Sequence, residues 1–228
     1  MAPRRLNRIA HAARRDEFIE AGRRLIQTRG YERFTIEDLL AEVGASKGAF
    51  YHYFDSKPAL LEAVVERFAD EVVMAAASVV TDPRLPAVAK LERYFAAIAA
   101  RKTAERHFLE ELLRVWYSDE NAIVREKTRR QTIRLVAPHI AAIIRQGIAE
   151  GTIALVDPDE MARVVLALLL DAGDEAGELY LAQRNGTVTL DAVRRRVASY
   201  GTAIERLLGL QPGSVQLVDD ETLQTWFG

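Results

Sequence analysis

Residues 35–57, TIEDLLAEVGASKGAFYHYFDSK, contain the caps and the turn from which the fold can be predicted. Thr35 and Asp38 have the spacing of a capping box, in which the threonine hydroxyl accepts from the N–H three residues on and the carboxylate reaches back. The apolar pattern behind this cap predicts a short helix over residues 36–42. Gly44 then ends the pattern, because glycine tolerates the positive φ that often follows a helix C-terminus.

Ser46 offers a second N-cap, and the helix behind it carries an aromatic face. Phe50, Tyr53 and Phe54 are spaced i, i+3 and i+4, so we expect them to point together into a core. Two short helices joined by a tight glycine turn have the proportions of a helix-turn-helix, whose second helix enters the major groove of DNA. The alternative is a small helical subdomain whose aromatic cluster is only a core and whose lysines are only solvated.

The residues that this packing leaves outward suit the backbone and the base edges of DNA. Free N–H groups at the start of the second helix favour a phosphate oxygen, Lys47 adds a charge, and the Tyr51 hydroxyl can bond to phosphate. Gly48 allows the two backbones to approach closely. The candidates for contacts with base edges are Lys47, Ala49 and His52.

The rest of the chain also has the helical period, so the expected fold is all-α. A first helix is predicted over about residues 15–29, and Lys57-Pro58 opens a long one. Longer amphipathic stretches follow, and Pro138 lies inside one of them, where it predicts a kink. The tail from residue 211 fits either a short docked helix or a loose end.

Composition excludes several classes of protein. The chain has 228 residues, 49% hydrophobic and 28% charged, and no cysteine. Disulfides, thiol catalysis and cysteine-ligated metal sites are therefore excluded. The start has no apolar segment typical of a signal peptide, and the longest apolar run, residues 164–170, is too short to span a membrane. We expect a cytoplasmic protein with no membrane partner and no cofactor.

Charge is unevenly distributed along the chain. Residues 1–57 hold eleven Lys or Arg against eight Asp or Glu, whereas the rest holds twenty against twenty-five. A basic N-terminal segment followed by an acidic remainder indicates that the N-terminal segment binds DNA. Arg4, Arg5 and Arg8 lie in residues 1–13, which we expect to be a flexible basic arm. The arm can enter a minor groove or contact phosphates, and a disordered solubilising tail is the alternative.

The order of residues in the head resembles one known family. The run from Gly30-Tyr31 through Phe34-Thr35, residues 44–48 and residues 51–54 to Ser56-Lys57 resembles the N-terminal domain of the TetR family of transcriptional regulators. The resemblance covers about residues 15–65. It implies DNA contacts at Thr35, Ser46, Lys47, Gly48, Ala49, Tyr51, His52 and Lys57. Ala49 departs from the hydroxyl residue that the family often has at its position, which puts that contact in doubt.

The resemblance also implies a division into domains. Residues 14–57 would be the helix-turn-helix DNA-binding domain, residues 58–210 a helical regulatory and dimerisation domain, and residues 211–228 a C-terminal tail.

The predicted regulatory domain is expected to form a homodimer, for a reason that its own sequence gives. The helix predicted over about residues 159–183 is apolar around most of its circumference, so it needs cover on two faces. Paired with the apolar stripe of residues 193–208, it would form a four-helix interface across a two-fold axis, as the TetR family does. The alternative is a helix buried inside a monomer. The predicted interface residues are Leu168, Leu169, Val197, Tyr200 and Ile204.

The inward stripes of the body predict an effector pocket. Its predicted lining is Phe68, Val72, Leu91, Phe95, Leu112, Trp116, His139 and Val165. Such residues are often plain core, and a hydrogen-bonded core histidine is the alternative for His139. His107 has Glu110 and Glu111 at metal-ligand spacing, but its polar helix face indicates solvated surface, so no metal site is expected.

These features predict a homodimeric, all-α transcriptional regulator, expected to be a repressor. It would bind a palindromic operator in double-stranded DNA and release it when a small, largely apolar effector occupies the body. No catalytic residue is expected, because no Ser-His-Asp order, P-loop or dinucleotide fingerprint is found. Two alternatives stay open: an all-helical small-molecule-binding protein or enzyme with an unused helix-turn-helix head, and a regulator that acts through protein contact without a ligand.

Overall fold

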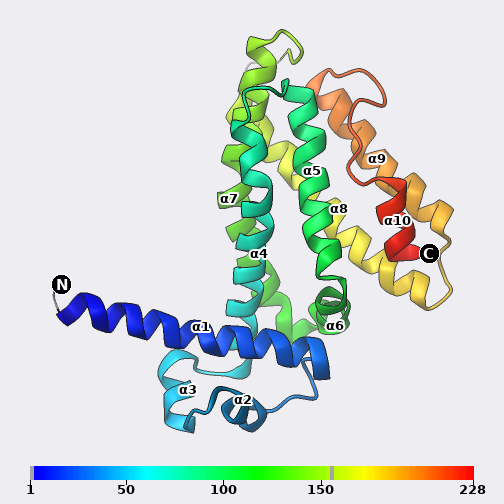
Figure 1. Ribbon diagram of the computed structural model, residues 1–228. Helices are drawn as coiled ribbons and strands as arrows, with labels where there is room; N and C mark the ends of the chain where they lie inside the picture. The colour runs from blue at the N-terminus through cyan, green and yellow to red at the C-terminus, as the bar shows by residue number, and fades with distance from the viewer. Residues whose placement is uncertain (1–2, 155–156) are drawn as a thin grey trace. The chain divides into compact units, whose positions relative to one another are not determined.

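The computed structural model describes residues 3–154 and 157–228, with side chains from residue 10 onward. Every regular element in these residues is helical, so the all-α prediction is confirmed (Figure 1). The chain divides into two compact units. Unit 1 joins Met1–Ala69 to Arg106–Thr128, and unit 2 joins Asp70–Glu105 to Arg129–Gly228. Across the described part of the chain, no helix is long and apolar enough to cross a membrane.

Unit 1 contains the predicted helix-turn-helix. Its helices are α1 (Pro3–Arg29), α2 (Ile36–Val43), α3 (Lys47–Tyr53), the first part of α4 (Lys57–Thr81), α6 (Arg106–Trp116), the short 3-10 helix η1 (Asp119–Asn121) and the first turns of α7 (Ala122–Ala149). The bounds of α2 and α3 agree with the sequence prediction to within a residue or two, because both helices begin at caps that the sequence displays.

Helix α1 begins much earlier than expected. It runs without a break from Pro3 to Arg29, so the segment predicted as a flexible arm, residues 1–13, is helical from Pro3 onward. Proline suits the first turn of a helix, and the residues that follow are rich in alanine and arginine, which are strong helix formers. The side chains of Arg4, Arg5 and Arg8 lie outside the described residues.

Aromatic rings form the core of unit 1. Phe18, Phe50 and Phe54 are buried, and the Phe18 ring lies 5.8 Å from Phe50 and 6.3 Å from Phe54. The prediction that Phe50 and Phe54 face a core is thus confirmed. Tyr53 differs from that prediction because it is only half-buried, with its ring 5.9 Å from Phe18.

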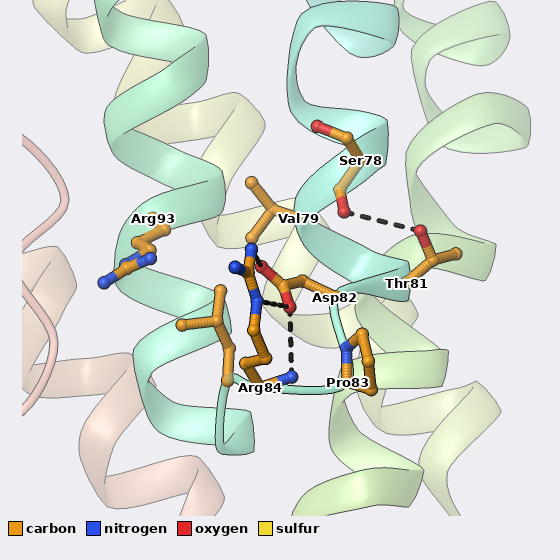
Figure 2. Close-up of a pocket in the computed structure, with 8 residues that line it drawn as sticks. Ser78, Val79, Thr81, Asp82, Pro83, Arg84 and Arg93 are labelled. Atoms are coloured by element: carbon orange, nitrogen blue, oxygen red, sulfur yellow. Dashed lines mark hydrogen bonds and ion pairs between the residues drawn. The ribbon is translucent and has the colours of Figure 1, made fainter.

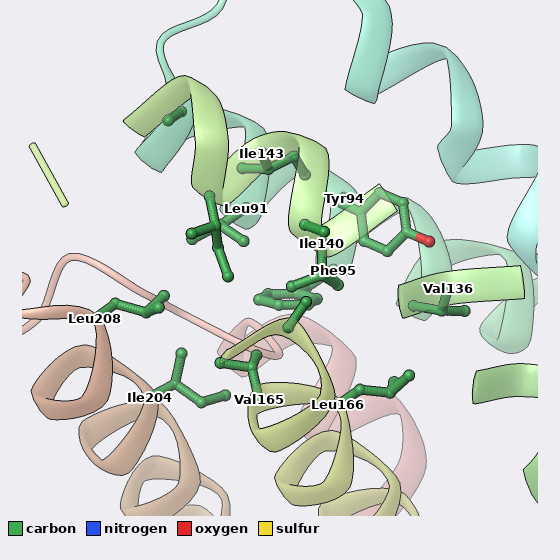
Figure 3. Packing of buried hydrophobic residues seen from close by; sticks show 14 of the residues in the cluster. Leu91, Tyr94, Phe95, Val136, Ile140, Ile143, Val165, Leu166, Ile204 and Leu208 are labelled. Carbon is green, nitrogen blue, oxygen red and sulfur yellow. The ribbon is translucent and has the colours of Figure 1, made fainter. Parts of the chain in front are cut away.

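Unit 2 is built around one apolar cluster. It comprises the second part of α4, α5 (Ala87–Ala104), most of α7, α8 (Pro158–Arg184), α9 (Leu190–Leu208) and α10 (Asp220–Phe227). Figure 3 shows side chains of α5, α7, α8 and α9 meeting in this cluster: Leu91, Tyr94, Phe95, Val136, Ile140, Ile143, Val165, Leu166, Ile204 and Leu208. Helix α7 continues through Pro138.

The tail forms a docked helix, which decides between the two alternatives that the sequence left open. Helix α10 begins at an Asp219 cap and packs against α5, α8 and α9 (Figure 1). Phe227 is buried, with its ring 6.2 Å from Tyr180, and the Trp226 Nε1–H donates to Thr103 Oγ1 at 2.9 Å. Arg194 pairs with Asp220 at 2.7 Å.

Candidate nucleic-acid interface

The first short helix of the pair is set by its two caps. The Thr35 hydroxyl accepts from the Asp38 N–H at 3.1 Å, and the Thr35 N–H donates to the Asp38 carboxylate at 2.8 Å. The predicted capping box is therefore confirmed. Gly44 ends α2 in the left-handed region with φ of +64°, which glycine adopts without steric cost.

Ion pairs attach α2 to α1. Arg29 pairs with Asp38 at 2.6 Å, and Arg24 pairs with Glu42 at 2.7 Å. The backbone and hydroxyl hydrogen bonds from Thr35, with a smaller contribution from Arg29, hold the pKa of Asp38 below its usual range. Because α2 and α3 are joined only by a tight turn, these contacts also limit how α3 can move.

Helix α3 presents its first turn and one side to solvent. Ser46 caps it by accepting from the Ala49 N–H at 3.2 Å, and the first N–H groups of a helix have no intrahelical acceptor. Lys47 is exposed, with its Nζ 4.0 Å from Glu37 Oε1, so its charge stays accessible to an anion. Tyr51 is 44% exposed, His52 is also exposed, and Ala49 is half-buried.

Gly48 lies in the first turn of α3 with nothing crowding it. A Cβ built at this position would have one neighbouring atom within 4 Å, Ser46 Oγ at 4.0 Å. Unlike Gly44, Gly48 has no positive φ. The packing of the protein therefore gives no reason for a glycine here, whereas the close approach of another molecule would.

Thr35 and Lys57 differ from the residues of α3 because contacts within unit 1 engage them. The Lys57 ammonium donates to the Phe34 carbonyl at 2.7 Å and lies 4.3 Å from the centre of the Phe34 ring. Burial lowers the pKa of Lys57. The Thr35 hydroxyl donates to Asp38 at 2.9 Å while it accepts from the same residue. A phosphate contact at either residue would have to compete with these bonds.

His11 is a residue of this surface that the sequence reasoning missed. Its ring centre lies 5.3 Å from that of His52 and 4.6 Å from that of Tyr53. This contact exists because α1 extends beyond the expected start of the helix. The only sequence signal for it was the helix propensity of the segment before Arg14, since no spacing rule links positions so far apart.

The residues of the predicted effector pocket divide between the two units. Phe68, Leu112 and Trp116 belong to unit 1, where Phe68 packs against Phe108 with ring centres 5.4 Å apart. In unit 2, Leu91, Phe95 and Val165 are buried in the apolar cluster of Figure 3. The other two residues of unit 2 are Val72, which is buried, and His139.

His139 lies beside the unit 2 cluster and forms its polar contact with Tyr94. The Tyr94 hydroxyl lies 3.0 Å from His139 Nδ1, and Tyr94 is fully buried. Burial raises the pKa of Tyr94 and lowers the pKa of His139, so both side chains favour their neutral forms. This matches the hydrogen-bonded histidine that the sequence allowed as an alternative.

A surface hollow lies at the turn between α4 and α5 (Figure 2). Its polar contacts are internal, because the Arg84 guanidinium donates to both oxygens of Asp82 at 2.9 and 2.8 Å. These bonds lower the pKa of Asp82 and leave the hollow without an obvious ligand. The lining residues are Ser78, Val79, Thr81, Asp82, Pro83, Arg84, Leu85 and Arg93.

The predicted dimer residues occupy different depths in α8 and α9. Ile204 is fully buried inside unit 2, so its side chain cannot meet a partner without rearrangement. Leu168 and Leu169 are half-buried and pack against the unit 2 cluster. Val197 is half-buried, and Tyr200 donates a 2.5 Å hydrogen bond to Asp171 on α8. Val164, which was not predicted, is 46% exposed on α8.

Comparison with known proteins identifies a family model and curated relatives that each match part of the chain. Residues 18–64 match the family model described as "Bacterial regulatory proteins, tetR family". The transcriptional repressor DhaR of Mycobacterium sp. (strain GP1) is 33% identical over 84 residues, 37% of this chain and 42% of DhaR. The repressor KstR2 of Mycolicibacterium smegmatis is 34% identical over 59 residues, 26% of this chain and 29% of KstR2. The chain thus spans less than half the length of these relatives.

Solved structures extend the similarity of fold to most of the chain. A TetR transcription regulator from Haloarcula marismortui is similar with a TM-score of 0.61 and 20% identity, over 87% of this chain and 97% of that one. RolR without ligand gives a TM-score of 0.59 at 18% identity, over 92% and 95% of the two chains. RolR in complex with resorcinol gives 0.56 at 20% identity, over 95% and 94%. At such identities, the likeness concerns the fold alone.

Proposed function

Because residues 18–64 match the model of the tetR family of bacterial regulatory proteins, we propose that this chain is a TetR-family transcriptional repressor that binds a palindromic operator in double-stranded DNA as a homodimer. The observation that carries the proposal is the outward face of α3. Its capped first turn offers free N–H groups, an accessible lysine and an uncrowded glycine, and its exposed side adds a tyrosine hydroxyl and an imidazole.

Each of these groups suits a particular part of the DNA, either a phosphate or a base edge in the major groove. The first turn of α3 meets a phosphate, because the helix dipole and unpaired N–H groups favour an anion and Lys47 adds a positive charge. The Tyr51 hydroxyl bonds to a second phosphate. Lys47, Ala49 and His52 then face base edges, with guanine suited to the lysine and a thymine methyl to the alanine.

The homodimer uses the outer faces of α8 and α9 in this proposal. Helix α8 packs on α9 within the chain and leaves Val164 exposed, so this apolar side chain is available to a partner. A two-fold axis would place two α3 helices about 34 to 36 Å apart on DNA, one helical turn, which requires a palindromic operator. Leu168, Leu169, Val197 and Tyr200 would contribute their partly exposed surface.

The effector is a small, largely apolar molecule that binds in unit 2. The cluster there consists of apolar side chains, and the Tyr94 hydroxyl lies on His139 beside it, which suits a small ligand with few polar groups. RolR has been solved with resorcinol, a small uncharged aromatic molecule, which makes resorcinol a first compound to test. Effector binding favours a distance between the two DNA-binding parts of the dimer that does not fit the operator, and so it releases the DNA.

We assign the protein no catalytic role and place it in the cytoplasm. The relatives DhaR and KstR2 are both named as repressors, which supports the direction of regulation. The competing reading is a helical binding protein or enzyme whose head is unused. The outward face of α3 disfavours this alternative, because a helix-turn-helix that binds no DNA would not require an uncrowded glycine beside an exposed lysine.

Selection from a pool of random DNA duplexes tests this function directly. The purified protein should enrich a palindrome, and its affinity should fall steeply as salt rises, because phosphate contacts release counterions. Tyr51→Phe keeps the ring against Phe50 and removes the hydroxyl, so the affinity for the selected site should fall about tenfold. A folded, dimeric protein that enriches no sequence would refute the proposal.

A further inference from the structure

Three aromatic rings meet at the edge of the candidate DNA interface. His11 of α1 contacts His52 and Tyr53 of α3, and the His52 and Tyr53 rings lie 5.0 Å apart, so each ring contacts the other two. The His11–His52 contact is T-shaped, with an angle of 76° between the rings. Aromatic rings prefer this edge-to-face arrangement, because the positive edge of one meets the negative face of the other.

The core of unit 1 holds this group of rings in place. Tyr53 is half-buried against Phe18, which is fully buried. One turn along α1 from His11, the Arg15 guanidinium lies over the Phe54 ring at 5.2 Å. Helix α1 therefore contacts α3 and its C-cap residue through two positions on the same face, since residues i and i+4 are neighbours on a helix. These contacts fix where the His11 ring lies relative to α3.

A fixed ring matters for reading a base. His52 is exposed on a helix of seven residues, so without a neighbour its ring would sample several rotamers. Holding the ring in one rotamer before DNA arrives reduces the entropy that binding loses. A contact to a base edge also needs a defined direction, because each base presents its donors and acceptors at set positions in the groove.

We propose that His11 is a positioning residue for DNA recognition: its ring holds the His52 ring in one orientation, so the base preferred at the position that His52 meets depends on a residue of α1. The inference rests on the proposed function. His11 acts through His52, and it makes no contact with a base itself.

The test compares the sites that four proteins select from random duplexes: wild type, His11→Ala, His52→Ala and the double variant. His52→Ala should lose base preference at one position in each half-site. His11→Ala should weaken the preference at that same position about threefold to tenfold and leave the other positions unchanged. The double variant should match His52→Ala, because His11 has nothing to position once His52 is gone. His11→Phe should restore the preference, since it keeps an aromatic edge.

Controls separate positioning from loss of structure and from a direct contact. His107→Ala removes another exposed histidine of unit 1 and should leave the selected site unchanged. Thermal melting of each variant checks that the fold persists. If His11→Ala selects the wild-type site with unchanged preference, the inference is wrong. It is also wrong if His11→Ala reduces the salt dependence by one phosphate contact, because His11 would then bind DNA directly. If wild type selects no site, the proposed function itself has failed.

Discussion

At the scale of single residues, the candidate interface contains two kinds of polar side chain. Thr35 and Lys57 form hydrogen bonds within unit 1: Thr35 donates to Asp38, and Lys57 donates to the Phe34 carbonyl. Lys47 and Tyr51 stand outward on α3 with exposed polar ends. Substitution at the first kind should therefore affect folding as well as binding, whereas substitution at the second should affect binding alone.

Gly48 gives the clearest separation of folding from binding. Gly48→Ala adds a methyl group that the protein can accommodate, so the free energy of unfolding should rise by about 0.5 kcal/mol, as alanine favours a helix over glycine. The affinity for operator DNA should fall about tenfold, because the methyl group holds the backbones apart. Urea unfolding and a binding titration measure the two effects.

Gly44 provides the matched control for Gly48. Its φ of +64° places it in the left-handed region, so Gly44→Ala should lower the free energy of unfolding by about 1 kcal/mol. Equal effects of the two alanine substitutions on stability would contradict the assignment of Gly48 to the interface.

The Asp38 carboxylate makes the stability of unit 1 depend on pH. Its pKa is lowered in the folded protein by the hydrogen bonds from Thr35 and then by Arg29, so the carboxylate stabilises the fold above its unfolded pKa of about 3.9. This stability is lost as pH falls through the lower, folded pKa. Wild type should therefore unfold at higher urea than Asp38→Asn at pH 7, and the difference should shrink below about pH 4. An unchanged difference across this range, or the same profile for Glu37→Gln, would refute the assignment.

At the scale of elements, several helices depend on contacts outside themselves. Helix α3 has seven residues and α10 has eight, and helices this short are unstable alone in water. The caps at Ser46 and Asp219 explain where they begin. Burial of Phe50 in unit 1 and of Phe227 in unit 2 explains why they persist.

Docking of α10 should contribute measurably to unit 2. Phe227→Ala removes a buried ring and should lower the free energy of unfolding by about 3 kcal/mol, whereas Gln224→Ala on the exposed side should change it by less than about 0.5 kcal/mol. Urea unfolding followed by circular dichroism compares them. If both variants unfold like wild type, α10 does not dock in solution.

At the scale of the whole molecule, the two compact units do not coincide with domains that follow one another along the chain. The sequence predicted a boundary at residue 57, but α6 and the first turns of α7 belong to the same compact unit as the helix-turn-helix. The predicted pocket residues are divided between the units for this reason. Helices α4 and α7 each contribute residues to both units, so they connect the proposed DNA-binding and effector-binding parts.

The proposed dimer face can be tested at Val164. Val164→Asp places a charge on an exposed position of α8, so the chain should keep its helical content while the dimer dissociates, because an unpaired charge is costly to bury in an interface. Light scattering measures the mass. Met74→Asp is the control, since Met74 is 74% exposed on α4, a helix that the proposed interface does not use. A dimeric Val164→Asp protein would move the interface elsewhere.

Features that depend on near neighbours along the chain could be predicted before the structure was known. The capping box at Thr35, the Ser46 cap, the turn at Gly44 and the all-α fold follow from residues a few positions apart, for which helix geometry sets which groups meet. The order of residues around them also predicted the similarity to the tetR family, whose model matches residues 18–64.

Contacts between distant positions became known from the three-dimensional structure. It placed His11 on His52, the Lys57 ammonium on the Phe34 carbonyl, Ile204 inside its own unit, and α10 on α5, α8 and α9. Helical periodicity shows which face of a helix is apolar, but many partners can cover an apolar face. The partner is selected by the packing of the whole unit, because close packing leaves few arrangements that fill the core without voids.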